Sequence, residues 1–429
     1  MMRVPLTSCA MTTTVPSRLA LAGLLAALSM FGPFCIDAIF PAFPAIAGEY
    51  AASPVTMQQT ISVYIGSYAV LSLLLGAMSD SWGRRTVILG GVGVFLIASA
   101  GCALARSMHM LLAFRALQGS SAGIGLIVGR AIVRDRYEGP DAQRLLSQIS
   151  MIFGVAPAIA PIVGAWLVAF GGWRWLFWAI AGFAAALLML CAAVLPETHP
   201  RERRIALRPG NLFRNYRSIL AHPHFLPLAF ASTCNFGGLF LYIAAAPAFV
   251  LGILKLDQNQ FWWLFVPTIS GLVLGATLAS RLAGRATVRV ILGIGYSIIA
   301  AAALLGIIMA WLVVPPRVPW LVLPLALSGV GINIVSPALN LLVLDLFPQA
   351  RGMASSLQAF LMLAFNALLA GVIAPLLADQ AIHLALSSAV VYAMGLLAWR
   401  WYRGREKRMP ALQHLVPETT ADLSGGAAE

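Results

Sequence analysis

The sequence contains few charged residues for its length. Only 10% of its 429 residues are Asp, Glu, Lys or Arg, whereas 60% are hydrophobic. A soluble chain usually has about 25% charged residues, so too few are present here to cover a soluble surface. The hydrophobic residues form runs of about 20, the length that a helix needs to cross the hydrocarbon layer of a bilayer. The sequence therefore predicts an all-α membrane protein with many crossings.

The sequence also lacks the patterns that hold metals, disulfides or catalytic centres. No two cysteines have CxxC spacing, and all six histidines lie outside the hydrophobic runs or at their edges. No nucleophile is paired with a base at one depth of the membrane. We therefore expect no metal site, no cofactor and no enzymatic activity. The cysteines are interpreted as small apolar residues: Cys9, Cys35, Cys102, Cys191 and Cys234.

The distribution of positive charge predicts the topology. The formal net charge is +13, but no basic cluster is interleaved with aromatic residues, so nucleic acid is not an expected partner. With the N-terminus placed in the cytoplasm, 23 of the 28 Lys and Arg residues fall in inside segments, 4 fall in outside loops, and Arg115 lies within a span. Basic residues concentrate in cytoplasmic loops, so both termini are predicted to be cytoplasmic. The first run is too long for a cleaved signal peptide, and Met1 and Met11 are both compatible with the start of translation.

Twelve hydrophobic helices are predicted, six on each side of a polar interruption. Their approximate ranges are 19–44, 57–79, 86–105, 109–132, 143–169, 173–195, 225–250, 259–281, 287–313, 319–343, 352–377 and 381–402. The predicted organisation is an N-terminal segment (1–18), a six-helix bundle (19–195), a linker loop (196–224), a second six-helix bundle (225–402) and a disordered tail (403–429). The joints GAMSDSWGRR and GATLASRLAGR follow the second and eighth helices and indicate an internal repeat.

The first of these joints combines an acid with glycines and arginines. An ordinary turn on the cytoplasmic side would explain both arginines, but not the acid with two glycines. The joint resembles the signature G-x-x-x-D-x-x-G-R-R/K of the major facilitator superfamily. In that family the acid belongs to a latch that holds the outward-facing state shut on the inside. The resemblance implies a gating role for Gly76, Asp80, Gly83, Arg84 and Arg85.

The predicted helix 109–132 carries a stripe of polar and small residues on one face. The stripe begins at Arg115 and continues through Gln118, Gly119, Ala122 and Gly123. A guanidinium in the membrane must face a cavity or a partner, unless it reaches the outer headgroups. The segment RALQG resembles the family's R-x-x-Q-G motif, which implies a role for Arg115 in proton coupling.

Asp37 is the acid that falls inside a predicted span. Pro41 cannot donate a backbone hydrogen bond to the Asp37 carbonyl, so we expect the helix to kink there. A buried carboxyl near an arginine can load and release a proton as water access alternates; the alternative is a partly exposed acid near the outer surface. Asp37, Pro41 and Pro44 resemble the D-x-x-x-P-x-x-P motif of drug:proton antiporters. An earlier acid found in some relatives is missing here, where only Ser29 is polar.

Prolines and glycines also form a stripe in the predicted helix 143–169. Gly154, Pro157, Pro161 and Gly164 recur at intervals of three and four. Each proline bends the helix and each glycine allows close packing, so a simple kinked helix is one interpretation. The segment GVAPAIAPIVG resembles a variant of the antiporter motif in the Bcr/CflA group, which separates exporters from uptake symporters.

Uncharged polar residues within the spans are candidate ligand contacts. Large apolar walls with a few hydrogen-bonding groups suit a lipophilic ligand, although each such residue alone is more often a contact between helices. The candidates are Tyr64, Tyr68, Gln118, Asn235, Tyr242, Asn333 and Gln358.

The resemblance covers residues from about 19 to 402 and implies a twelve-helix major facilitator fold. It implies a monomeric drug:proton antiporter of the bacterial inner membrane that moves small lipophilic molecules. A proton-coupled exporter of a metabolite, such as a sugar or an amino acid, remains the alternative on the same fold. A membrane-embedded enzyme and a ligand sensor are disfavoured, because the spans hold no catalytic group and the polar segments are too short for a sensor domain.

Overall fold

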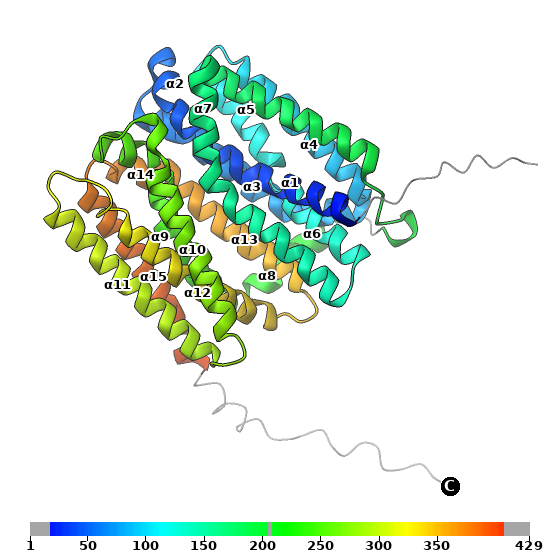
Figure 1. Ribbon diagram of the computed structural model, residues 1–429. Helices are drawn as coiled ribbons and strands as arrows, with labels where there is room; N and C mark the ends of the chain where they lie inside the picture. Colours follow the sequence, from blue (N-terminus) through cyan, green and yellow to red (C-terminus); the bar gives the residue numbers. More distant parts are fainter. Residues whose placement is uncertain (1–17, 205–207, 407–429) are drawn as a thin grey trace, which may run out of the picture.

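The two halves of the chain form two helical bundles that lie side by side (Figure 1). The computed structural model describes residues 18–204 and 208–406, and every regular element in these ranges is a helix. The first bundle contains α1 (Arg18–Asp37), η1 (Phe40–Ala42), α2 (Phe43–Tyr50), α3 (Pro54–Trp82), α4 (Arg84–Ala103), α5 (Met108–Ser121), α6 (Ile124–Arg136) and α7 (Gly139–Val194). The second contains α9 (Phe225–Ala244), η3 (Ala248–Ile253), η4 (Gln258–Gln260), α10 (Trp262–Leu282), α11 (Val288–Leu312), α12 (Leu323–Asp345), α13 (Arg351–Leu368), η5 (Leu369–Ile373), α14 (Ala374–Leu377) and α15 (Ala381–Glu406).

Helix α7 contains two of the predicted spans, joined without a loop. Its backbone leaves the helical region at Gly171 (φ −147°) and Gly172 (φ 78°). The positive φ of Gly172 favours glycine, which has no Cβ to clash in this conformation. Within the described ranges, eleven helical stretches are long and apolar enough to cross a membrane, and one of them is the 41-residue stretch Gly154–Val194. Division of that stretch at the turn brings the number of crossings to the twelve that the sequence predicts.

Two predicted helices are interrupted. The predicted helix 19–44 breaks after Asp37, where α1 ends, and the chain continues through η1 into α2, which extends to Tyr50. This break confirms the kink expected from Pro41. The predicted helix 109–132 divides into α5 and α6 at Ala122 and Gly123.

The segments outside the bundles also differ from the sequence prediction. The predicted loop 196–224 contains η2 (Arg201–Arg203) and the amphipathic helix α8 (Pro209–Leu220). The predicted tail begins too early, because α15 continues through Glu406. The rest of the tail, 407–429, and the first 17 residues lie outside the described ranges.

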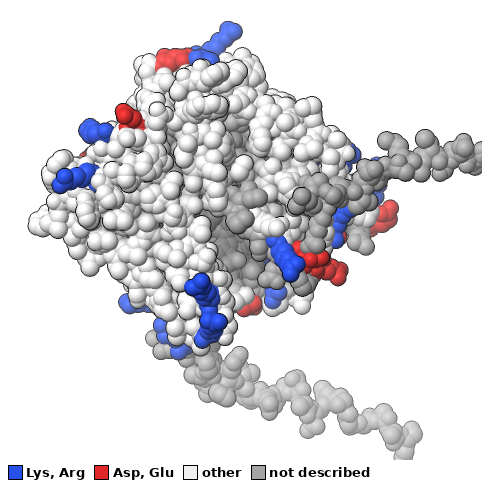
Figure 2. Space-filling model, viewed as in Figure 1, with Lys and Arg blue, Asp and Glu red and all other residues white. Residues whose placement is uncertain are grey.

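The helices run between two opposite ends of the molecule. We name these the Asp80 end, where α1 begins, and the Glu49 end, where α2 ends. At the Glu49 end, Arg174 Nη1 and Trp173 Nε1 each donate a hydrogen bond of 2.8 Å to Glu49 Oε2. These bonds hold α2 against the second limb of α7. Figure 2 shows charged side chains near the edges of the visible face and a broad uncharged area between them, as expected for a surface in contact with lipid.

Candidate functional site

The structure buries Asp37 at the point where α1 ends. Its side chain is 3% exposed, and Oδ1 has no hydrogen-bond partner among the described residues. The interpretation of Asp37 as a partly exposed surface acid is therefore wrong for this conformation. A buried carboxylate without a partner is costly as an anion, so this group needs a proton, a cation or water to complete it.

The stripe on the first limb of α7 packs partly against this break. A Cβ at Gly164 would overlap the carbonyl oxygen of Ala38, the residue after Asp37. Pro161 is buried one turn away, whereas Gly154 is exposed and a Cβ there would meet no atom within 4 Å. The close approach of α7 to the Asp37 break therefore depends on Gly164.

Arg115 is fully buried in the first bundle. Its Nε donates to the Thr60 carbonyl of α3 (3.2 Å), and its Nη1 donates to Gln118 Oε1 (2.6 Å). Gln118 Nε2 in turn donates to Ser99 Oγ of α4 (2.8 Å). The guanidinium is therefore held by partners inside the bundle and does not reach the headgroups.

Arg115 and Asp37 form no ion pair in the described structure, although both belong to the same bundle. Arg115 Nη1 donates to the carbonyl of Cys35 (3.4 Å), two residues before Asp37, and Nη2 has no partner among the described residues. The Tyr64 ring lies 4.3 Å from the guanidinium carbon, and the Tyr64 hydroxyl donates to the Gly32 carbonyl (2.9 Å). The arginine is thus connected to the backbone of α1 and not to the Asp37 carboxylate.

The small residues of the Arg115 stripe bring neighbouring backbones together. A Cβ at Gly119 would overlap the Tyr64 carbonyl, and one at Gly123 would overlap the Tyr68 ring. Close packing through glycine is the usual means of helix association in a membrane. It places α3 directly against the helix that carries Arg115.

The joint between α3 and α4 forms a charged cluster at the Asp80 end. Asp80 Oδ1 lies 2.6 Å from Arg84 Nη1, and Arg84 Nε lies 3.0 Å from Asp135 Oδ2 at the end of α6. The Arg84 backbone N–H donates to Glu197 Oε1 (2.9 Å), just beyond α7. Arg84 thus connects α3, α4, α6 and the linker within one bundle.

The two glycines of this joint have different surroundings. Gly83 has φ 96°, a backbone conformation that favours glycine, and a Cβ there would displace the ends of the Glu197 and Arg204 side chains. A Cβ at Gly76 would meet no atom within 4 Å. Gly76 therefore permits no close helix contact in this conformation.

Sequence reasoning did not identify Asp135 and Glu197 as members of the charged cluster. Both are acids at the ends of predicted spans, in the segments RDRY and PETH. Thr198 also donates to Asp135 Oδ2 (3.0 Å). The sequence did contain a signal for them. The two acids lie at the end of the molecule that is rich in arginine, where an acid is expected to pair with an arginine.

Most candidate ligand contacts are engaged between helices. Tyr64 and Gln118 belong to the Arg115 cluster described above. Asn235 Nδ2 donates to Ser336 Oγ (3.0 Å), Asn333 Nδ2 donates to the Leu272 carbonyl (2.8 Å), and Gln358 Nε2 donates to Ser232 Oγ (3.0 Å). Tyr68 is buried against Gly123, and Tyr242 lines a small cavity inside the second bundle. Among the described residues, the amide oxygens of Asn235 and Gln358 have no partner.

The bundles contact each other near the Glu49 end. Gln59 Nε2 donates to the Gly371 carbonyl (2.9 Å), and Ser62 Oγ donates to the Ala367 carbonyl (2.8 Å). Gly371 belongs to the π-helical turn η5, a type of distortion found often at functional sites. The ring of Phe40 also stacks on Phe265 of α10, with centroids 6.1 Å apart.

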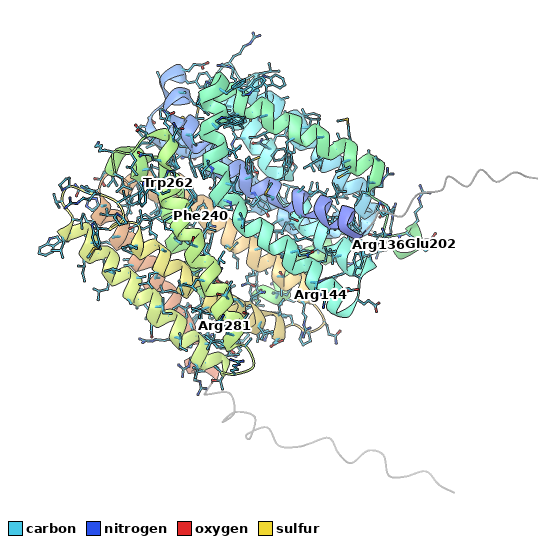
Figure 3. All side chains as sticks on the ribbon, viewed as in Figure 1. Arg136, Arg144, Glu202, Phe240, Trp262 and Arg281 are labelled. Atoms are coloured by element: carbon cyan, nitrogen blue, oxygen red, sulfur yellow. The ribbon has the colours of Figure 1, made fainter. Side chains whose placement is uncertain are left out.

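Figure 3 labels residues at both ends of this interface. Trp262 lies near the Glu49 end of α10, whereas Arg281 lies at the other end of the same helix. Arg144 of α7 occupies the corresponding end of the facing bundle. Both arginines are exposed, so the Asp80 end presents like charges on the two bundles.

Comparison with known proteins identifies the family. The family model described as Major Facilitator Superfamily matches residues 19–375. This chain belongs to the major facilitator superfamily. The facilitator is accordingly a multi-pass membrane transporter.

Its relatives include proteins named for drug resistance. The facilitator is 28% identical over 387 residues to a bicyclomycin resistance protein homolog of Haemophilus influenzae, with 89% of this chain and 95% of the relative covered. It is 30% identical to the uncharacterized transporter YdgK of Bacillus subtilis, over 85% of this chain and 89% of the relative. It is also 30% identical to the multidrug resistance protein MdtL of Escherichia fergusonii, over 59% of this chain and 62% of the relative.

A solved structure supports the fold. The crystal structure of the human organic anion transporter MFSD10 matches with a TM-score of 0.64 at 18% identity, over 89% of this chain and 99% of that one. The likeness confirms the predicted major facilitator fold, with its two bundles of transmembrane helices.

Proposed function

We propose that this facilitator exports small lipophilic molecules across a bacterial inner membrane in exchange for protons. The observation that carries the proposal is Asp37, a buried carboxyl without a partner on Oδ1 at a break in the first span. An ionisable group inside a membrane is costly and is typical of a proton or substrate pathway. A carboxyl at a helix break can meet water from one side and then from the other as the bundles move.

The arrangement of the bundles supports alternating access. The bonds of Gln59 and Ser62 close the Glu49 end, and the facing arginines Arg144 and Arg281 lie at the opposite end. Because basic residues concentrate at cytoplasmic ends, we place the Asp80 end in the cytoplasm, so that the end held by the Gln59 and Ser62 bonds is the outer one. Asp80 pairs with Arg84 of its own bundle here. In our proposal Asp80 engages the other bundle only when the inner end closes.

The remaining polar groups suit a weakly polar ligand. The free amide oxygens of Asn235 and Gln358 are acceptors in the second bundle, set among apolar side chains. The relatives named for resistance to bicyclomycin and to several drugs favour a drug-like substrate. We propose that one chain suffices, because both bundles are present in it.

Proton release from inverted vesicles tests the exchange. Vesicles that carry the protein are acidified inside, and candidate drugs are added outside. We expect each transported drug to release protons, in amounts that saturate with drug concentration. If no drug does so, antiport of drugs is contradicted. If a sugar or an amino acid releases protons where drugs do not, the metabolite exporter is the correct alternative.

A further inference from the structure

The helix between the bundles, α8, is anchored to both of them. Ile219 is 2% exposed, and the Tyr216 hydroxyl donates to the Leu73 carbonyl of α3 (2.9 Å). Helix α8 also packs against α13 of the second bundle. One face of α8 therefore bridges the first and second bundles on the side of the molecule where α3 and α13 meet.

A second apolar strip of α8 is exposed. Phe213 and Leu220 are seven residues apart, so they share a face, and their side chains are 70% and 37% exposed. At about 100° per residue, Arg217 lies about 40° further round the helix than Phe213, and Arg214 lies about 100° further. Both arginines are exposed. The order around the helix is thus buried apolar, exposed apolar and then basic.

The charge of this region favours an anionic partner. No acid occurs between Glu202 and Asp257, a stretch that includes the whole of α8. Arg214 Nη2 bonds to Asn211 of its own helix (2.5 Å), which neutralises no charge. A second copy of this chain is a poor partner, because each copy has a formal net charge of +13.

We propose that α8 lies in the headgroup layer and binds anionic lipid. Phe213 and Leu220 insert into the acyl boundary, and Arg214 and Arg217 contact lipid phosphates, in the manner of an amphipathic helix at a membrane surface. Because Tyr216 connects α8 to α3, and α8 also packs against α13, lipid charge then stabilises the contact between the bundles at this position. Anionic lipid would thereby change the rate at which the Asp80 end opens and closes.

Hydrogen exchange of residues 209–220 tests the proposal without any transport assay. The full-length protein is placed in nanodiscs of zwitterionic lipid, with or without added anionic lipid, at low ionic strength. We expect anionic lipid to slow exchange in α8. Each arginine near an anionic surface strengthens binding about fivefold, so Arg214→Gln with Arg217→Gln should reduce the lipid effect about twenty-fivefold. Added salt should weaken the effect in the wild-type protein.

The matched control is Arg281→Gln with Arg285→Gln, which removes the same charge from the same end of the second bundle. It should leave the lipid effect on α8 intact. Phe213→Ser should speed exchange in both lipid mixtures, because it removes the inserted ring. Equal exchange of wild-type α8 with and without anionic lipid would overturn the proposal. Protection that rises with protein concentration would also overturn it and would identify a second copy as the partner.

Discussion

The two bundles share one architecture but bury different chemistry. The first bundle buries the ionisable groups Asp37, Arg84 and Arg115. In the described part of the second bundle, the buried polar side chains inside the spans are uncharged, among them Asn235 and Gln358, and His224 lies at its edge. Burial of a charge in a membrane protein is expensive and is retained where it has a function. The difference is consistent with our proposal that the first bundle binds and releases the proton, while the second contributes most of the residues that contact the ligand.

The largest expected effect is the loss of proton-driven export in Asp37→Asn, which we compare with Gln358→Ala in the second bundle. Asp37→Asn keeps the shape of the side chain but removes its proton equilibrium. Proton-driven export should fall about a hundredfold or more, the scale expected when a positioned proton-transfer group is lost. Gln358→Ala should weaken ligand binding and leave the number of protons exchanged per molecule unchanged. Transport and binding are measured on the same vesicles, with the exposed Asp345→Asn as a charge control. Full export by Asp37→Asn would contradict the proposal that the first bundle carries the proton and the second binds the ligand.

Arg115→Lys should destabilise the protein more than a polar deletion in the second bundle. A lysine cannot reach Thr60, Cys35 and Gln118 together, and buried acceptors left without partners cost about 1–3 kcal/mol each. We expect a loss of about 3 kcal/mol for Arg115→Lys and about 1 kcal/mol for Asn235→Ala. Thermal unfolding in detergent measures both. Equal losses would show that the buried guanidinium has no special structural role.

The repeated joint allows the same substitution in both bundles. Gly83 and Gly284 occupy matching positions with φ 96° and 74°, but only at Gly83 would a Cβ meet neighbouring atoms. A non-glycine residue at such a positive φ costs about 1–3 kcal/mol. Gly83→Ala should also displace Glu197 and slow transport, whereas Gly284→Ala should show the backbone cost alone. Unfolding and transport rate are compared for the two variants, and equal transport rates would show that displacement of Glu197 does not affect transport.

The smallest effect concerns the contact between the bundles. Gln59→Ala and Ser62→Ala each remove a hydrogen bond worth about 1 kcal/mol, so each should shift the population away from the closed Glu49 end about fivefold. Distances between spin labels on the two bundles report the shift. Ser72→Ala is the control, because Ser72 bonds to Ala69 of its own helix. A shift as large in the control would show that these bonds do not hold the end closed.

The hydrophobic runs and the position of Pro41 were sufficient to predict an all-α membrane protein, the number of its spans and the break at Asp37. Hydrophobic runs and the positions of prolines depend on local sequence, so they are visible without coordinates. The partners of Arg84 were not predicted, since Asp135 and Glu197 are 51 and 113 residues away along the chain. The bond from Arg115 to the Cys35 carbonyl, in place of an ion pair with Asp37, was also missed, because helix order alone does not say which group a guanidinium meets. The segment of α8 was predicted to be a loop, because its many basic residues make the short apolar face of the helix hard to recognise in the sequence.

The turn in α7 has a practical consequence for labelling the Glu49 end. Gly171 and Gly172 form the entire connection between the two limbs. The connection therefore contains no loop that an antibody could bind or a protease could cleave. An epitope tag inserted there would separate the two limbs and break the hydrogen bonds from Trp173 and Arg174 to Glu49. A label at the same end of the molecule is better placed in the longer connection between α11 and α12, where ten residues, 313–322, separate the helices.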